Sequence, residues 1–467
     1  MRKFDTKVQY LKYKVLREVV RYAYADKLRT AYVDIPKKII EGPEATMRCC
    51  IYKERAIVQE RIKLALGGDK ENPNVIEVID IACDECPVGG YEVTDACRGC
   101  IAHRCEDSCK KGAITFDSSQ KAHIDKTKCV ECGLCAKECP YSAITDNKRP
   151  CVSACKVKAL KTETGKPAEI DYTRCTSCGA CVFRCPFGAI MDKSFILDTI
   201  DILRKSEGNT RYKTYAIAAP SIASQFSYAE LSQVVTGILR LGFYKVDEAA
   251  AGAEMIVPDE AAELAEKGFL TTSCCPAFVM HVEKQYPDMT KHISHSLSPM
   301  AALGKAIKEK DPTAKVVFIG PCTAKKAEFA REEVAPYIDS VITFEELQAL
   351  FDGRDIDIAA LEGTELSGAG YFGRIFARSG GVSEAVANAL KEQGRGDFEL
   401  KAVPCDGIEA CNTALLKASK GRADGNFIEG MACQGGCIGG AGCLTHGVKN
   451  KHEIDKYAGT PPQEKTE

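Results

Sequence analysis

The sequence predicts a multidomain protein in which an α+β, cysteine-rich first half precedes an α/β domain with parallel sheets. The chain has 467 residues, which is enough for about three domains. Of its 26 cysteines, eighteen precede residue 186 and the other eight follow residue 273. From Tyr212 to about Gly447, short apolar runs alternate with Ala-rich helical patterns, as in TYAIAAP, KVVFIG and PDEAAELAEKG. That alternation is typical of parallel α/β layers.

The composition argues against several classes of function. The 63 Lys and Arg residues nearly balance the 65 Asp and Glu residues, so the net charge of -2 provides no basic field for nucleic acid. No apolar run is long enough to span a bilayer, and the charged first residues are unlike an export signal. We therefore expect a cytoplasmic protein with no nucleic-acid partner and no direct membrane span. In a reducing compartment, regularly spaced cysteines indicate metal or redox chemistry more often than disulfides.

Residues 1–78 are predicted to be a helical N-terminal region with an apolar stripe at spacings of three and four. The stripe consists of Val8, Leu11, Val15, Val19 and Tyr22. The basic residues opposite it are expected on a solvated face. The remaining regions are a cysteine-rich domain at 79–193, a helical linker at 194–211, the α/β domain at 212–447 and a mobile polar tail at 448–467.

The strongest local pattern is C-x2-C-x2-C-x3-C-P, which occurs twice. The two runs are Cys129, Cys132, Cys135 and Cys139, and then Cys175, Cys178, Cys181 and Cys185. In such a run three thiolates ligate one [4Fe-4S] cubane and the fourth ligates the other cluster of the pair. We therefore expect one cluster on Cys129, Cys132, Cys135 and Cys185, and a second on Cys175, Cys178, Cys181 and Cys139. The segment resembles the bacterial two-cluster ferredoxins, so a ferredoxin-like domain is expected. Zinc is the alternative occupant, although zinc sites usually use two pairs of ligands.

Eight further cysteines surround these runs: Cys83, Cys86, Cys97, Cys100, Cys105, Cys109, Cys151 and Cys155. They suit one or two additional [4Fe-4S] clusters. By the same cross-ligation, one group is Cys97, Cys100, Cys105 and Cys155, which leaves Cys83, Cys86, Cys109 and Cys151 for the other. Structural zinc, and His103 as a replacement ligand, are alternatives. Cubanes in series would form an electron relay from the surface to a buried site.

Four fragments of the α/β half carry the residues of chemical interest. They are AAPSIASQF at 218–226, TTSCCPAF at 271–278, GPCTAKKAE at 320–328 and EGMACQGGC at 429–437. Four thiolates from three of these loops can close on one cubane: Cys275, Cys322, Cys433 and Cys437. The two glycines before Cys437 let the backbone approach a bulky group. From the residues alone, buried structural cysteines beside glycine turns explain the pattern equally well.

The order TSCCP, PCTAKK, MACxGGC resembles the three signature segments of the [FeFe]-hydrogenases. In that family four cysteines hold a [4Fe-4S] cluster, and the last also bridges to a two-iron subsite carrying CO, cyanide and an azadithiolate; together these form the H-cluster. The resemblance assigns the ligands to Cys275, Cys322, Cys433 and Cys437, with Cys437 as the bridge. Around the subsite it implies hydrogen bonds to cyanide from Lys325, Ser221 and the backbone near Pro220, and packing by Met431.

The resemblance also implies a path for the proton that is released when H2 is split. In the family this path runs from a cysteine through Glu, Ser and Glu, which correspond here to Cys274, Glu260, Ser294 and Glu263. A thiol next to a metal can have a pKa low enough to relay a proton. Glu260 and Glu263 lie three apart on one predicted helical face. Ordinary helix-surface acids are the alternative for these two residues.

The resemblance thus implies an [FeFe]-hydrogenase that interconverts H2 with protons and electrons, relayed through [4Fe-4S] clusters to a ferredoxin or similar carrier. It also implies that hydrogenase maturation enzymes act on the chain. Two alternatives are a non-catalytic hydrogenase-like protein of iron-sulfur cluster assembly, and an H2 sensor or subunit of a larger complex. Departures from the usual family residues at Gly320, Ala277, Phe278 and Gln434 indicate a divergent subgroup. No role follows for Cys49, Cys50, Cys405, Cys411 and Cys443.

Overall fold

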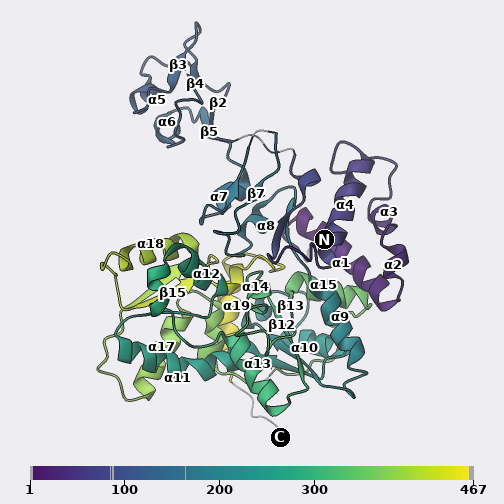
Figure 1. Ribbon diagram of the computed structural model, residues 1–467. Helices are drawn as coiled ribbons and strands as arrows, with labels where there is room; N and C mark the ends of the chain where they lie inside the picture. Colours follow the sequence, from purple (N-terminus) through teal and green to yellow (C-terminus); the bar gives the residue numbers. More distant parts are fainter. Residues whose placement is uncertain (1–3, 85, 87–88, 164, 367, 462–467) are drawn as a thin grey trace.

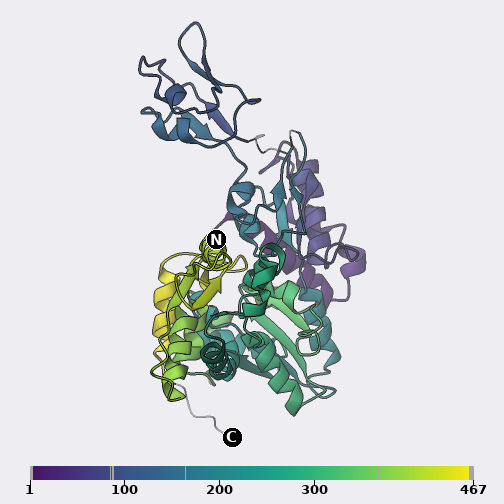
Figure 2. The same ribbon diagram turned by 60° about the vertical axis from the view of Figure 1, so that its left-hand side comes forward.

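The computed structural model describes residues 4–84, 86, 89–163, 165–366 and 368–461. Three parts follow one another in space (Figure 1): a small module that projects outward, a second small module that joins it to the rest, and a large body. Figure 2 shows from another side that the projecting module lies apart from the body. None of the described helices is both long and apolar enough to cross a membrane.

The first part of the chain is helical. Its helices are α1 (Lys7–Tyr24), α2 (Leu28–Ala31), α3 (Ile35–Ile39) and α4 (Ile51–Ala65). A capping box starts α1, in which the Thr6 hydroxyl accepts from the backbone N–H of Gln9 and the Gln9 side chain accepts from that of Thr6. Val15 and Val19 of the predicted stripe are buried.

Lys12 of α1 lies beside the apolar stripe and not opposite it. This side chain is buried, and its Nζ lies 2.6 Å from carboxylate oxygens of both Asp192 and Glu345. The reason is that α1 packs between α4 on one side and α15 (Phe344–Gly353) on the other, so more than one face is covered. The amphipathic pattern therefore marks only part of the buried surface of this helix.

The two small modules share one strand arrangement. In the projecting module the elements are β2 (Tyr91–Val93), α5 (Arg104–Asp107), β3 (Ile114–Phe116), β4 (Ala122–Ile124), α6 (Leu134–Glu138) and β5 (Ile144–Asp146). In the joining module they are β1 (Ile76–Val78), η1 (Asp80–Ala82), α7 (Pro150–Ala154), β6 (Leu160–Lys161), β7 (Glu169–Ile170), α8 (Ala180–Arg184) and β8 (Ile190–Asp192). In each, the outer strands pair antiparallel (β2 with β5, β1 with β8), as do the inner strands (β3 with β4, β6 with β7). The projecting module is inserted between η1 and α7 of the joining one.

The body contains two parallel sheets, which confirms the predicted α/β class. One has the order β10-β9-β12-β13 and the other the order β11-β15-β14. Their bounds are β9 (Thr214–Ala218), β10 (Lys245–Glu248), β11 (Leu270–Thr271), β12 (Lys315–Gly320), β13 (Ser340–Thr343), β14 (Ala402–Asp406) and β15 (Phe427–Met431). The runs TYAIA and KVVFIG are β9 and β12, as expected.

Helices cover both sheets and tie them together. They are α9 (Ile196–Lys205), α10 (Leu231–Arg240), α11 (Ala249–Lys267), α12 (Pro276–Gln285), α13 (Pro299–Lys310), α14 (Lys325–Glu328), α15, α16 (Tyr371–Arg374), α17 (Gly381–Glu392), α18 (Ile408–Ala418) and α19 (Lys449–Ala458). Short 3-10 helices are η2 (Pro220–Ser224), η3 (Pro287–His292), η4 (Ile358–Ala360), η5 (Ile375–Ala377) and η6 (Cys437–Gly439). The contact between α11 and α13 joins the two halves of the body. The expected linker helix is α9, which packs against β13 and α1 with Ile196 buried.

The expected mobile tail is wrong for residues 449–458. These residues form α19, which packs against η2 and η5 with Ile454 fully buried. Two buried apolar residues, Ile454 and Ala458, on an otherwise polar helix leave little periodic signal, which is why the sequence indicated no element here. The last part of the predicted tail, residues 462–467, lies outside the described residues.

Candidate active site

The proposed ligands and several residues expected around them follow the carboxyl ends of parallel strands. Pro220 and Ser221 come after β9, Cys274 and Cys275 after β11, and Cys322 and Lys325 after β12, while Cys433 and Cys437 come after β15. Loops at this end of parallel sheets form the usual ligand-binding crevice of α/β proteins. The two sheets therefore present their functional loops to a common site.

The four predicted thiol ligands of the body lie together. Cys275, Cys322 and Cys437 all act electrostatically on Cys433, and burial together with these thiols raises the pKa of Cys433. Burial and Cys275 likewise raise the pKa of Cys437 to about 12. Gly436, at φ 89°, allows this loop to pass close to the main chain of residues 377–379, because a Cβ there would lie 2.7 Å from the Ser379 nitrogen. Four converging thiols are a suitable donor set for a metal cluster.

The residues implied to surround a two-iron group also fit one. Ser221 is fully buried on η2, which packs against η6, and its Oγ has no hydrogen-bond partner within the described residues. A buried hydroxyl without a partner is costly, so a ligand with acceptor atoms would satisfy it. The Lys325 ammonium is buried, donates to the Cys274 carbonyl at 3.4 Å and ion-pairs with Glu328 at 2.6 Å. Burial lowers the pKa of Lys325, but Glu328 more than offsets this, so the lysine stays charged. Met431 is buried at the end of β15.

The four residues of the implied proton path lie near one another, and Glu263 is nearer the surface than Glu260. Glu260 is 1% exposed on α11 and acts electrostatically on Cys274, and its Oε2 has no hydrogen-bond partner within the described residues. One turn further along α11, Glu263 accepts a hydrogen bond from the Ser294 hydroxyl at 3.1 Å. Its carboxylate also meets Lys267 at 2.6 Å and the largely exposed His295 at 3.1 Å. Glu260 and Glu263 therefore differ from ordinary helix-surface acids.

The pKa values of Cys274, Glu260 and Glu263 are shifted in different directions. Burial, followed by Glu260 and Cys275, raises the pKa of Cys274, so its thiol keeps its proton at neutral pH. The ionisable groups around this thiol are acids and other thiols, and they act in the same direction as burial. Burial, then Glu263 and Glu429, raises the pKa of Glu260 to about 8. Burial also favours the neutral form of Glu263, but hydrogen bonds from Lys267, the His295 backbone and Ser294 lower its pKa overall.

Sequence reasoning missed two acids of this site. Glu328 is the buried ion-pair partner of Lys325. Glu429 is fully buried, accepts hydrogen bonds from the backbone of Gly380 and from Ser383, and acts electrostatically on Cys274 and Glu260. Both residues lie inside the fragments quoted above: Glu328 is three positions after Lys325, and Glu429 is two positions before Met431. This closeness in sequence could have pointed to them.

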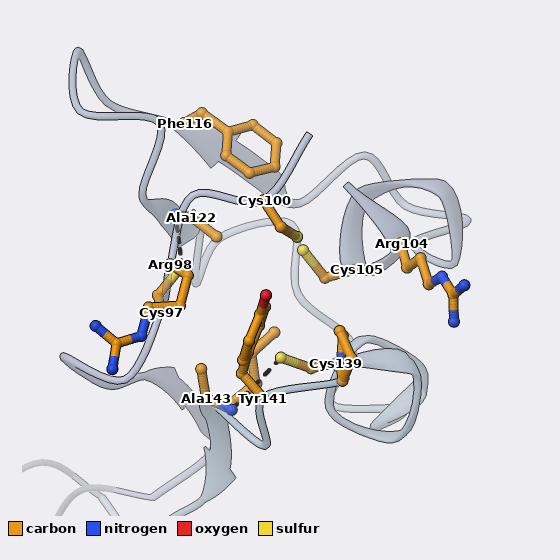
Figure 3. A pocket seen from close by; sticks show the side chains of 12 residues that line it. Cys97, Arg98, Cys100, Arg104, Cys105, Phe116, Ala122, Cys139, Tyr141 and Ala143 are labelled. Atoms are coloured by element: carbon orange, nitrogen blue, oxygen red, sulfur yellow. Dashed lines mark hydrogen bonds between the residues drawn. The ribbon is translucent and has the colours of Figure 1, made fainter. Parts of the chain in front are cut away.

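In the projecting module the thiols form two groups, and both differ from the sequence-based grouping. Cys97, Cys100, Cys105 and Cys139 line one small cavity together with Tyr141, as Figure 3 shows. Cys135, from the run that begins at Cys129 and Cys132, interacts electrostatically with Cys109 and Cys129. Each cysteine run of the projecting module thus receives its fourth thiol from the other run of the same module: Cys139 joins the first group and Cys109 the second. Neither Cys155 nor Cys185 belongs to these groups. His103 stacks on Phe116 instead of joining the thiols.

The joining module also brings together two groups. Cys155, Cys175, Cys178 and Cys181 line a second small cavity. The other group contains Cys83, Cys86, Cys151 and Cys185, since the first two and Cys185 all act electrostatically on Cys151. The expected partners Cys139 for the Cys175 run and Cys109 for Cys83 are therefore wrong. The reason is topological, because the projecting module is complete in itself and interrupts the ligand run of the joining module.

The joining module meets the body at its cysteine loop. The Thr323 hydroxyl, next to Cys322, donates to the Ser177 carbonyl at 2.7 Å. Gly179 makes this approach possible at φ 75°, because a Cβ there would lie 2.6 Å from the Thr323 hydroxyl oxygen. Cys178 and Cys433 line the same cleft, which has a volume of about 840 Å³. The thiols of the joining module are thus next to those of the body.

Comparison with known proteins matches these three parts separately. Residues 212–441 match the family model described as the iron only hydrogenase large subunit, C-terminal domain. The body of the chain belongs to this family. Residues 96–143 match a 4Fe-4S dicluster domain and residues 168–191 a 4Fe-4S binding domain. The dicluster match covers all the cysteines of the projecting module, including the four that line the cavity in Figure 3.

Both hydrogenases and an assembly factor are among the relatives of this iron-only hydrogenase domain. Iron hydrogenase 1 of Clostridium pasteurianum is 30% identical over 48% of this chain and 47% of its own length. The NADP-reducing hydrogenase subunit HndD of Solidesulfovibrio fructosivorans is 30% identical over 46% of each chain. The cytosolic Fe-S cluster assembly factor NAR1 of Eremothecium gossypii is 33% identical over 31% of this chain and 34% of its own length. The chain thus spans about half or less of the length of these relatives.

Proposed function

We propose that this chain is an [FeFe]-hydrogenase that reversibly oxidises H2 and reduces protons at an H-cluster on Cys275, Cys322, Cys433 and Cys437. The observation that carries this proposal is the series of Cys274, Glu260, Ser294 and Glu263, in which Glu260 interacts electrostatically with Cys274 and Glu263, and Ser294 donates to Glu263. A protein that uses only cubanes for electron transfer or cluster assembly has no need of a buried proton path. This series distinguishes the proposal from a purely structural or electron-carrying role for the body.

The surroundings of the four thiols support binding of the two-iron group. Cys437 is the proposed bridging ligand. The charged Lys325, the Ser221 hydroxyl and the backbone near Pro220 are the proposed hydrogen-bond donors to the anionic cyanide ligands, and Met431 packs beside them. When bound, the two-iron group would supply the heterolytic cleavage and formation of H2. The ion pair with Glu328 orients Lys325 in this role.

The chain's own residues would move the proton. Cys274 keeps its proton at neutral pH and is the first donor or acceptor at the site. Glu260, with a pKa of about 8, exchanges protons near neutral pH in either direction. The Ser294 hydroxyl then relays the proton to Glu263, whose lowered pKa keeps it able to accept. From Glu263, the exposed His295 opens the path to solvent.

The proposed electron path passes through cubanes of the projecting and joining modules. Its last step would run from the cluster that includes Cys178 to the one that includes Cys433, across the contact between Thr323 and Ser177. A ferredoxin or similar carrier in the cytoplasm would exchange electrons with the other end. Hydrogenase maturation enzymes would supply the two-iron group.

Infrared spectroscopy tests this proposal directly. The chain is produced anaerobically together with the maturation enzymes of the family and compared with a Cys437→Ala variant. We expect bands from iron-bound CO and cyanide, together with H2 evolution, in the natural chain only. A fully iron-loaded chain without these bands would instead favour a role in Fe-S cluster assembly, the role for which the NAR1 relative is named.

A further inference from the structure

We propose that Cys83, Cys86, Cys151 and Cys185 bind a [4Fe-4S] cluster of their own, whose negative charge is balanced by the buried guanidinium of Arg61. The 4Fe-4S binding match at 168–191 includes Cys185 but none of the other three thiols, and the dicluster match includes none of the four. The inference concerns the electron relay alone and does not depend on the H2 chemistry proposed above.

The first argument is the equivalence of the two small modules. Both have the same outer and inner strand pairs, so their loops correspond. In the projecting module one cavity is lined by three thiols of the first ligand run, Cys97, Cys100 and Cys105, and by the last thiol of the second run, Cys139. In the joining module the first run is split by the insertion into Cys83-x2-Cys86 and Cys151-x3-Cys155. The corresponding first site therefore consists of Cys83, Cys86, Cys151 and Cys185.

The second argument is the geometry of these four thiols. Cys83, Cys151 and Cys185 are buried, and Cys83, Cys86 and Cys185 all act electrostatically on Cys151. The backbone N–H of Ala189 donates to the Cys185 sulfur at 3.2 Å, as that of Ala143 does to Cys139 in the equivalent site at 3.4 Å. Hydrogen bonds to ligand sulfurs of this kind favour the thiolate form and tune cluster potentials.

The third argument is the position of Arg61. Its side chain is 1% exposed, and its Nε has no hydrogen-bond partner within the described residues. The remaining nitrogens donate to the Met191 sulfur and the Phe187 carbonyl, both at 3.0 Å, and within the described chain no carboxylate forms an ion pair with it. Arg61 interacts electrostatically with Cys185. A buried guanidinium without a counterion is unfavourable, and a cubane with four thiolate ligands is an anion that compensates it.

Two other arginines border the same site. Arg149 lies 3.9 Å from the Cys83 sulfur, and the Arg48 guanidinium lies over the Phe187 ring, two residues after Cys185. Reduction adds one negative charge to a cubane, so nearby positive charges favour the reduced cluster. Arg61 should therefore make the reduction potential of this cluster more positive than it would otherwise be.

The first experiment counts iron in the full chain, purified anaerobically without the maturation enzymes. Five cubanes, one of them in the body, correspond to roughly 20 iron atoms per chain. We expect the double variant Cys83→Ala/Cys86→Ala to lose roughly four of these. The matched control is Cys49→Ala/Cys50→Ala, an adjacent pair outside the four-thiol groups, which should keep all of its iron. Unchanged iron in the first variant, or stoichiometric zinc in the natural chain, would overturn the proposal.

The second experiment remains informative if the cysteine variant fails to fold. Arg61→Met keeps all four ligands, so we expect full iron content and a shift of one cluster midpoint to more negative potential in an electron paramagnetic resonance titration. Arg61→Lys should restore much of the natural midpoint. Arg55→Met is the control on the same helix, since among the described residues Arg55 donates to the carbonyls of Ile40 and Glu41 and to no cysteine. Identical midpoints in Arg61→Met and the natural chain would contradict the charge compensation.

Discussion

Substitution of Glu260 by glutamine tests the proposed proton path while leaving the fold of the body unchanged. Glutamine has the shape of the protonated carboxyl but exchanges no proton in the neutral range. If Glu260 relays the proton, kcat should fall by roughly 10²- to 10⁴-fold, the usual contribution of a positioned acid or base. The iron content and the infrared bands should stay unchanged, because Glu260 contacts no proposed ligand of the clusters directly.

The same substitution should change how stability depends on pH. Burial raises the pKa of Glu260 from 4.5 to about 8 in the folded chain. Between these values the folded state holds a proton that the unfolded chain releases, so the associated stability is complete below pH 4.5 and is lost as the pH rises through 8. At about 1.4 kcal/mol per pH unit, Glu260→Gln should be more stable than the natural chain by up to about 3 kcal/mol at pH 7.

Two assays measure these effects. H2 evolution with reduced methyl viologen reports kcat, and thermal unfolding at a fixed scan rate between pH 4 and 9 reports the stability difference. Glu266→Gln, at an exposed position of the same helix α11, is the matched control and should change neither quantity. Normal turnover in Glu260→Gln, or a stability difference that does not grow between pH 5 and 8, would refute the reasoning.

Three other substitutions test separate parts of the molecule. Cys274→Ala should retain iron-bound CO and cyanide bands but lose roughly 10²- to 10⁴-fold in kcat, and near-normal turnover would remove the thiol from the path. Lys325→Met should leave the body's cubane in place but weaken retention of the two-iron group, which infrared band intensity per iron would show; undiminished bands would contradict the assigned role. Lys12→Met removes a cation from between Asp192 and Glu345, so it should lower the free energy of unfolding by roughly 3 to 5 kcal/mol. A thermal midpoint equal to that of the natural chain would contradict this reading of the buried pair.

The parts of the fold that local patterns control could be predicted from the sequence. The runs TYAIA and KVVFIG alternate with helical segments, and they are the neighbouring parallel strands β9 and β12. Because functional loops follow the carboxyl ends of such strands, the cysteines after these and the other strands could be expected at one site. The pair Glu260 and Glu263 could likewise be placed on one helix from their spacing alone.

The grouping of the ferredoxin-type thiols could not be predicted from spacing. The two most regular runs, at Cys129 and Cys175, are similar in sequence but belong to different modules. A local pattern does not show that residues between Cys86 and Cys151 form a complete module of their own. The grouping became evident from the thiols that line each cavity and from the strand partners, since β1 pairs with β8 across the whole insertion.

The burial of side chains whose partners lie far away along the chain also could not be predicted from the sequence. Lys12 is charged, yet it is buried, and its two carboxylate partners come from the joining module and from α15. The raised pKa of Cys274 has the same origin, because Glu260 comes from another element of the body. Such effects arise from assembly of the parts and leave no periodic signal in any one of them.

The two ends of the inserted module meet at a single point. The backbone N–H of Asn147 donates to the Gly90 carbonyl at 2.9 Å, and a Cβ on Gly89 would lie only 3.6 Å from the Lys148 Cα. A short loop could therefore replace everything in between without disturbing the rest of the chain. The length of the electron-transfer chain is in this sense a modular property, which evolution or an engineer could lengthen or shorten by one insertion while the chemistry at the far end stays the same.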